Sequence, residues 1–135
     1  GRPALGPNAI AKYDGELSVV DGIGLTNLEM DSTLAVVLNH VEGVARNRVQ
    51  ADQVTQRTGI TDQQWWEMIG PAFADVFDAN RFPVAGRVGE AAGQTHQAAH
   101  SPEHAYHFGL ERLIDGVAAH IGHSASTSGE SRGIA

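Results

Sequence analysis

Four histidines at helical spacing are the residues of this sequence most suited to metal chemistry. The set comprises His96, His100, His104 and His107. Histidines four apart on one helix can bind zinc or nickel through their imidazole nitrogens. Ser101 and Pro102 resemble a helix start, however, so the first two histidines need not continue the line of the last two. The chain has no cysteine, and no well-placed carboxylate completes the set. We therefore expect no cofactor and keep a histidine-rich metal-binding protein as the alternative function.

The sequence contains serine, histidine and aspartate residues, but they do not form a recognisable catalytic motif. No serine lies in a nucleophile elbow, and the glycine-rich stretch GRVGEAAG lacks the Lys-Ser/Thr pair of a phosphate-binding loop. The sequence therefore predicts that this chain is not an enzyme.

Aromatic and other large apolar side chains offer a different kind of chemistry, because pockets for apolar ligands are lined in this way. We expect a pocket lined by Tyr13, Leu17, Met30, Leu34, Val37, Val41, Trp65, Met68, Phe73 and Phe77. Trp65 and Trp66 cannot both face it, since neighbours on a helix point about 100° apart. Trp65 and Phe73 would share one face if their helix stays regular past Gly70. Filling of the core is the competing role for each of these residues.

The elements that must position these side chains are helices. Apolar residues recur at steps of three and four over residues 8–20, 30–55, 61–77 and 101–121, and strand signals are weak throughout. Residues 84–100 fit either a short helix or an ordered loop. The predicted fold class is therefore all-α, with about five helices in a single domain.

Several residues mark where these helices begin. Thr26 with Glu29, and Thr61 with Gln64, have the spacing of capping boxes, in which side chain and backbone bond reciprocally. Asn8 is a candidate cap for the first helix and Ser101 for the last. Pro71 lies inside the third helical stretch and predicts a kink or a break near Gly70.

Length and charge limit the remaining possibilities. With 135 residues and a net charge of −7, the chain is long enough for one core and lacks the basic face that nucleic-acid binding needs. No apolar run approaches the length of a membrane span, and no signal segment is evident, so we expect a cytoplasmic protein without a membrane partner. We assign residues 1–7 to a lead-in, 8–121 to the helical domain and 122–135 to a polar tail that is solvent-exposed or mobile.

Two glycines in the middle of the last helix favour close packing, with simple tolerance on a solvated face as the alternative. Gly109 and Gly116 each cost about 1 kcal/mol against alanine in a helix interior. They lie on nearly the same face, where missing side chains let another helix approach. A second copy around a two-fold axis would make that approach with two helices per subunit, giving a four-helix bundle. The residues expected in this interface are Gly43, Gly109, Arg112, Leu113, Gly116, Val117 and His120.

The stretch FGLERLIDGVAAHI closely resembles the last helix of the effector-binding, dimerising domain of tetracycline-repressor (TetR) family regulators. GLTNLEMDSTLAVVLNHVEGVAR and WWEMIGPAFADVFDANRFPVAGRVG resemble other parts of the same domain, so the resemblance spans residues 8–121. It implies a homodimer of a bacterial transcription repressor, with a small-molecule effector that binds inside each helical domain and relieves repression. The large apolar and aromatic residues named above indicate that this effector is hydrophobic or aromatic. Members of the family read DNA through an N-terminal helix-turn-helix, which this chain does not contain. We therefore expect contact with DNA only through such a domain outside this sequence.

Overall fold

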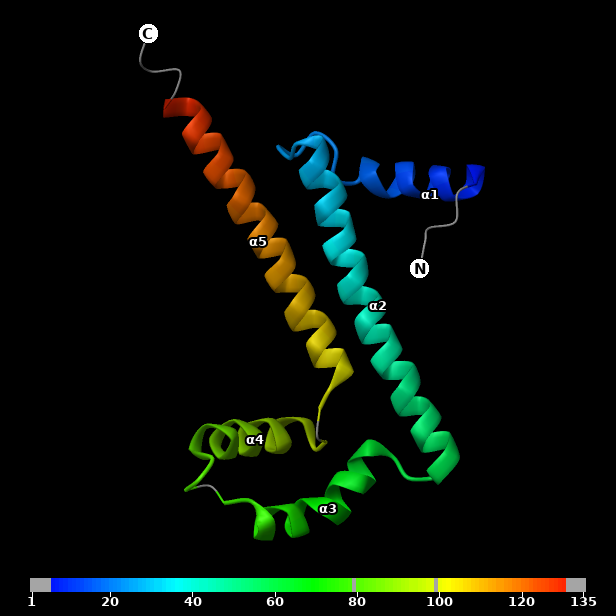
Figure 1. Cartoon of the computed structure of the whole chain (residues 1–135), viewed down its shortest axis with the longest axis vertical. Helices are drawn as coiled ribbons and strands as arrows, with labels where there is room; N and C mark the ends of the chain where they lie inside the picture. Colours follow the sequence, from blue (N-terminus) through cyan, green and yellow to red (C-terminus); the bar gives the residue numbers. More distant parts are fainter. Residues whose placement is uncertain (1–5, 79, 99, 131–135) are drawn as a thin grey trace. The chain divides into compact units, whose positions relative to one another are not determined.

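Five α-helices make up the part of the chain that the structure describes. The computed structural model describes residues 6–78, 80–98 and 100–130, and these contain no strand. In chain order the helices are α1 (Pro7–Ser18), α2 (Asn27–Thr58), α3 (Asp62–Val76), α4 (Pro83–His96) and α5 (Pro102–Glu130) (Figure 1). The predicted all-α fold class is confirmed.

Both predicted capping boxes are formed. The Thr26 backbone N–H donates to Glu29 Oε2 at 2.8 Å, and the Glu29 N–H donates back to Thr26 Oγ1 at 3.3 Å. At the start of α3 the Thr61 N–H donates to Gln64 Oε1 at 2.9 Å, and the Gln64 N–H donates to Thr61 Oγ1 at 3.2 Å. These side chains satisfy backbone donors that have no partner inside the first turn of a helix.

Two helices differ in detail from the prediction. The cap of α1 is Gly6 and not Asn8, because Pro7 takes the first helical position, where its missing N–H costs no hydrogen bond. Pro71 lies inside α3, which continues through it from Asp62 to Val76. Of the kink or break predicted near Gly70, the break is therefore absent.

The structure decides between helix and loop for α4 and extends α5 beyond its predicted end. Residues 83–96 form α4, where the sequence allowed a helix or a loop. The Ser101 hydroxyl caps α5 by accepting from the His104 N–H at 3.2 Å, as predicted. α5 then continues to Glu130, so residues 122–130 of the predicted tail are helical. Residues 1–5 and 131–135 of the predicted lead-in and tail lie outside the described residues.

The hydroxyl groups in this part of α5 bond within the helix. Ser126 Oγ donates to the His123 carbonyl at 2.8 Å, and Ser128 Oγ donates to the Ser124 carbonyl at 2.9 Å. Serine and threonine can satisfy their own hydroxyls in this way without leaving the helix. With no proline in the stretch, a polar composition alone does not end α5.

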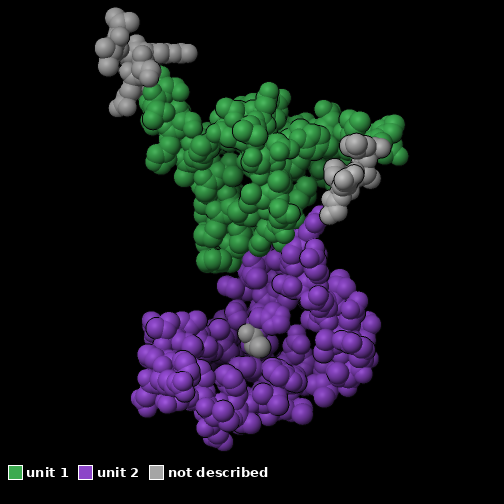
Figure 2. All heavy atoms as spheres, viewed as in Figure 1, with its two compact units in different colours: residues 1–41, 107–135 green, residues 42–106 purple. Residues whose placement is uncertain are grey.

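The chain divides into two units (Figure 2). Unit 1 comprises residues 1–41 and 107–135, and unit 2 comprises residues 42–106. Unit 1 therefore contains α1, the beginning of α2 and most of α5. Unit 2 contains the rest of α2, together with α3, α4 and the first turn of α5.

In unit 1 the helices α2 and α5 run antiparallel and side by side (Figure 1). Near the start of α2, Glu29 Oε1 lies 2.7 Å from His120 Nε2, and further along α2 the imidazole of His40 lies against Gly109. Residue numbers increase along α2 while those of the contacting residues of α5 decrease, as expected for antiparallel helices. The hydroxyl of Tyr13 joins α1 to α2 by donating to Asp31 Oδ1 at 2.5 Å.

In unit 2 the helices α3 and α4 meet through Trp66. Its indole lies close to Gly93 of α4 and to Gly70 of its own helix. Beyond the end of α3, the ring of Phe82 lies 6.1 Å from that of Phe77. Gln97 ends α4 in a left-handed conformation, with φ of 52°.

Few side chains are buried. Within the described residues the buried hydrophobic residues are Met30 and Ala98, which keep 9% and 8% of their surface exposed, while Leu28 is 76% exposed, Phe108 54% and Ile114 57%. Burial of apolar area is the main favourable term in folding. The chain on its own therefore leaves a large part of that stabilisation unrealised.

Candidate functional site

A hollow between α3 and α4 is the most aromatic site in unit 2, and we call it the α3–α4 hollow. It has a volume of about 590 Å³. Its lining comprises Trp66, Gly70, Phe73, Ala74, Phe77, Ala85, Gly86, Arg87, Gly89 and Glu90. Within α3, Trp66, Gly70 and Phe73 follow one another at steps of four and three, and Ala74 follows Gly70 by four, so these residues form a single face of that helix. Trp66, Phe73 and the C-cap residue Phe77 thus line the hollow as one stripe.

The α4 side of the hollow is made mostly of small residues. Ala85, Gly86 and Gly89 leave the space open, and Arg87 and Glu90 are the charged residues of the lining. The Glu90 carboxylate accepts a hydrogen bond from Gln94 Nε2 at 3.2 Å. Apolar walls with a few polar groups are typical of sites that bind small organic molecules.

The structure brings together part of the predicted pocket. Phe73 and Phe77 line the α3–α4 hollow, and their rings stack with centroids 5.5 Å apart. Met68, which is 63% exposed, lines a separate hollow beside Gly59 and Ile60. Trp65 is 47% exposed and does not line the α3–α4 hollow.

Trp66 is the aromatic lining residue that the predicted pocket did not include. A spacing of eight residues favoured Trp65 as the partner of Phe73. Trp66 stands seven residues before Phe73 and eleven before Phe77, which are also helical repeats of one face. Because Trp66 lies on the same helix face as both Phe73 and Phe77, the position of Phe77 in the sequence indicates that Trp66, and not Trp65, faces the pocket.

The other six predicted pocket residues lie in unit 1. They are Tyr13, Leu17, Met30, Leu34, Val37 and Val41. Met30 is buried, and the four aliphatic residues of this set are half-buried. Tyr13 is exposed, and its hydrogen bond to Asp31, assisted by burial and by the charge of that carboxylate, raises the pKa of the phenol.

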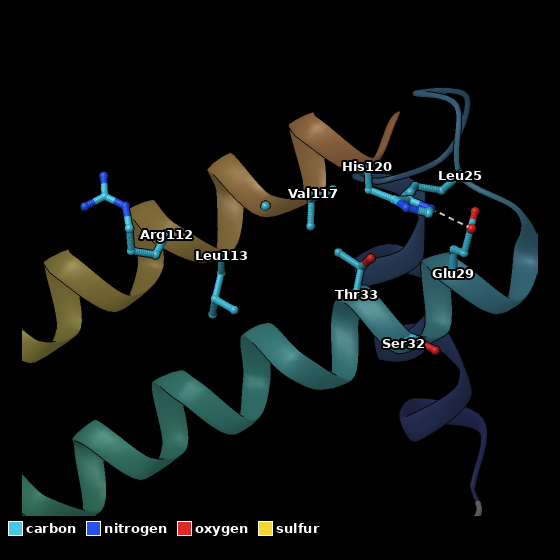
Figure 3. A pocket seen from close by; sticks show the side chains of 9 residues that line it. Leu25, Glu29, Ser32, Thr33, Arg112, Leu113, Val117 and His120 are labelled. Carbon is cyan, nitrogen blue, oxygen red and sulfur yellow. Dashed lines mark hydrogen bonds and ion pairs between the residues drawn. The ribbon is translucent and has the colours of Figure 1, made fainter. Parts of the chain in front are cut away.

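A second site lies in unit 1, between the beginning of α2 and α5, and we call it the α2–α5 groove (Figure 3). It has a volume of about 310 Å³. Its lining comprises Leu25, Glu29, Ser32, Thr33, Arg112, Leu113, Gly116, Val117 and His120. In Figure 3 the side chains of Leu113 and Val117 point from α5 toward α2, and Thr33 points back from α2. The centre of the groove is therefore apolar.

Five of the seven predicted interface residues line this groove. They are Arg112, Leu113, Gly116, Val117 and His120. Gly116 has no atom within 4 Å of the place where a Cβ would stand, so that face of α5 is open. Gly109 instead lies against His40 of the same chain, and Gly43 lies in unit 2 with open space beside it.

Charged groups at the ends of the groove are paired. Glu29 lies 2.7 Å from His120, and the pKa of Glu29 is lowered by the backbone N–H of Thr26 first, and then by the hydrogen bond of His120. Arg112 pairs with Asp115 at 3.1 Å, and its guanidinium lies 5.1 Å from the ring centroid of Phe108. The polar rim and apolar centre resemble the composition of protein interfaces.

The four histidines do not converge on one point. The rings of His96 and His104 have centroids 4.9 Å apart. His100 lines a different hollow with Asp62, and His107 falls in unit 1. Across residues 6–78, 80–98 and 100–130, no three His, Asp or Glu side chains come together as metal ligands would. The same residues include no helix long and apolar enough to cross a membrane.

Comparison with known proteins agrees with these observations. Residues 1–121 match the family described as tetracyclin repressor-like, C-terminal domain. The chain is also 30% identical over 117 residues to the HTH-type transcriptional repressor DrrR1 of Streptomyces coeruleorubidus. That match covers 86% of this chain and 41% of the relative, so the chain spans less than half the length of that repressor. By the match over residues 1–121, this chain belongs to the family of tetracycline-repressor-like C-terminal domains.

Proposed function

We propose that this chain is the effector-binding and dimerising part of a bacterial TetR-type transcription repressor. The observation that carries the proposal is the family match over residues 1–121, supported by similarity to a curated transcriptional repressor. DNA is read by a helix-turn-helix outside this sequence. This chain binds a small hydrophobic or aromatic effector in the cytoplasm, and effector binding relieves repression. The role is one of binding, with no catalytic step.

The α3–α4 hollow supports the effector part of the proposal. Its volume of about 590 Å³ falls within the range of roughly 300–1,000 Å³ that is usual for small-molecule sites. Trp66, Phe73 and Phe77 supply the apolar contact, while Arg87 and Glu90 can orient the polar groups of a guest.

The α2–α5 groove supports the dimer part of the proposal. Leu28 and Val36 of α2, and Phe108 and Ile114 of α5, are each about half or more exposed, so unit 1 retains apolar surface for a partner to cover. Gly116 lets a second backbone approach α5 from the open side. A second copy would then bury Leu113 and Val117 at the centre of a two-fold four-helix bundle, with Arg112 and His120 toward its rim.

Two measurements test this function. The reading frame upstream of residue 1 is expected to encode a helix-turn-helix, and the protein with that segment is expected to bind promoter DNA in a mobility-shift assay. A frame without a helix-turn-helix would overturn the assignment as a repressor.

Tryptophan fluorescence of the chain is expected to respond to a planar aromatic compound such as 2-naphthol, with or without EDTA. A response to zinc that EDTA reverses, and none to 2-naphthol, would favour the histidine-rich metal-binding alternative.

A further inference from the structure

Trp66 lines two hollows in unit 2. They are the α3–α4 hollow of about 590 Å³ and a smaller hollow of about 320 Å³. Gly70, Gly89 and Glu90 also line both. A movement of the Trp66 indole would therefore change the space available to a guest in both hollows.

Gly93 leaves room for the indole of Trp66 against α4. A Cβ at Gly93 would stand 2.9 Å from Trp66 Cζ2 and 3.4 Å from Cε2, and carbon atoms in proteins pack at about 3.5–4.0 Å. At Gly70 the nearest indole atom would be 4.0 Å away, which is ordinary contact. At Gly89, which lines both hollows, a Cβ would meet no atom within 4 Å. Of these three glycines, only Gly93 has to lack a side chain for the indole to occupy its place.

The rings around the hollow favour a flat guest. Phe73 and Phe77 are stacked with an interplanar angle of 29°, and Trp66 stands on the same face of α3, two helical turns before Phe73. Aromatic rings attract one another in offset-stacked and edge-to-face arrangements beyond the effect of buried area. A saturated molecule of the same size would bury a similar apolar area in the hollow, but it would lack the attraction between aromatic rings.

We propose that Trp66 is the specificity-determining wall of the α3–α4 hollow, that Gly93 is its positioning residue, and that together they select planar aromatic molecules over saturated ones of equal size. The inference rests on the proposed function, because it takes this hollow as the effector site. It adds the chemical class of the guest and the residue that distinguishes that class.

The first test compares a matched pair of ligands by isothermal titration calorimetry. The chain is titrated with 2-naphthol and with decahydro-2-naphthol, which has the same carbon skeleton without aromatic rings. We expect 2-naphthol to bind about two- to tenfold more tightly, the range that one aromatic contact supplies. The Trp66→Leu variant is expected to lose this preference. Equal affinities in the wild type, or a preference that survives Trp66→Leu, would overturn the proposal.

The second test separates the positioning role of Gly93 from general stability. In a Trp65→Phe background Trp66 is the only tryptophan, because the chain has two. Gly93→Ala is expected to shift the Trp66 emission maximum, increase quenching by acrylamide and reduce the preference for 2-naphthol. Gly122→Ala, which adds the same methyl group to a helix at a place outside the lining of the hollow and with no atom within 4 Å, is expected to change none of the three. If the two alanine variants behave alike, Gly93 has no positioning role.

A conservative replacement provides the rescue. In the chain with both tryptophans, Trp66→Phe combined with Gly93→Ala gives the added methyl group a smaller ring to meet. We expect this double variant to recover most of the preference for 2-naphthol that Gly93→Ala alone removes. Failure to recover it, with normal helix content by circular dichroism, would contradict the steric argument.

The outcomes also distinguish the inference from the function on which it rests. If the protein releases promoter DNA with an effector and the Trp66 variants keep the preference of the wild type, the inference fails while the repressor function stands. If the preference depends on Trp66 and the protein with its upstream segment binds no DNA, the repressor function fails while the recognition rule stands.

Discussion

Gly109 and Gly116 of α5 lie in different surroundings, although both occupy nearly the same face of that helix. A Cβ at Gly109 would overlap the imidazole of His40, whereas a Cβ at Gly116 would meet no atom within 4 Å. Gly109 thus serves packing between α2 and α5 inside one chain. Gly116 leaves an open surface, which our proposal assigns to a second copy.

Alanine substitutions test the packing at Gly109. Gly109→Ala gains helix propensity but forces the His40 ring to move, whereas Gly122→Ala adds a methyl group to the same helix where nothing lies within 4 Å. We expect Gly122→Ala to stabilise the chain by up to about 1 kcal/mol. The free energy of unfolding of Gly109→Ala is expected to be lower than that of Gly122→Ala by about 1–2 kcal/mol, because overpacking against His40 offsets the gain in helix propensity. Urea unfolding measures both, and equal stabilities would contradict the contact.

Glu29 connects two kinds of contact, because it closes the capping box of α2 and also pairs with His120 of α5. These contacts lower its pKa from the ordinary value of 4.5. A group whose pKa is lowered by folding stabilises the native state above its unfolded pKa and loses that effect as the pH falls.

The pH dependence of Glu29→Gln follows from this sign. We expect the variant to unfold at a lower temperature than the wild type at pH 7. The difference between the two melting temperatures is expected to shrink as the pH falls below about 4.5, the ordinary pKa of the glutamate carboxyl. Thermal unfolding of both proteins between pH 7 and pH 3 gives the comparison. A difference that stays constant over this range would mean that the ionised Glu29 carboxylate does not stabilise the fold.

At the scale of helices, the N-terminal boundaries depend on local hydrogen bonds. The α3 cap is formed by Thr61 and Gln64 bonding in both directions. We expect Thr61→Ala to lower the free energy of unfolding by about 1 kcal/mol, whereas Thr61→Ser keeps the hydroxyl and most of the stability. Chemical denaturation of the two variants provides the measurement. A loss of similar size in Thr61→Ser would show that the methyl group of Thr61, and not the cap, is what matters.

The same local signals explain which helices could be predicted from the sequence. Capping boxes and apolar repeats of period 3.6 are local features, so α2, α3 and the start of α5 were predicted with their first residues. The extension of α5 to Glu130 was missed because serine and threonine favour caps and turns in general, although their hydroxyls can also bond within a helix.

Tertiary neighbours explain what the sequence could not predict at the site. Phe73 and Phe77 were expected to line a pocket and do line the α3–α4 hollow. The choice between Trp65 and Trp66, by contrast, depends on which face of α3 meets Gly93 of α4. The periodicity of α3 indicates which face Trp66 shares with Phe73 and Phe77, but it does not indicate which helix that face meets, because the contact joins residues far apart in the chain.

At the scale of the whole molecule, the exposed apolar surface has to be accounted for. Met30 is the one buried hydrophobic side chain among the described residues of unit 1, while Leu28, Phe108 and Ile114 are more than half exposed. A two-fold bundle built on the α2–α5 groove would cover such side chains, and a stable interface of this kind buries more than about 1,000 Å² in total. Dimerisation is therefore the central claim of the account.

Sedimentation of the chain at micromolar concentration tests this claim most directly, with wild type compared with Gly116→Leu and Gly122→Leu. The wild type is expected to sediment as a dimer, and Gly116→Leu as a monomer, because the added side chain fills the space between the two backbones. Gly122 does not line the α2–α5 groove, so Gly122→Leu is expected to remain dimeric. A monomeric wild type, or a Gly116→Leu variant that stays dimeric and melts at a higher temperature, would contradict the account.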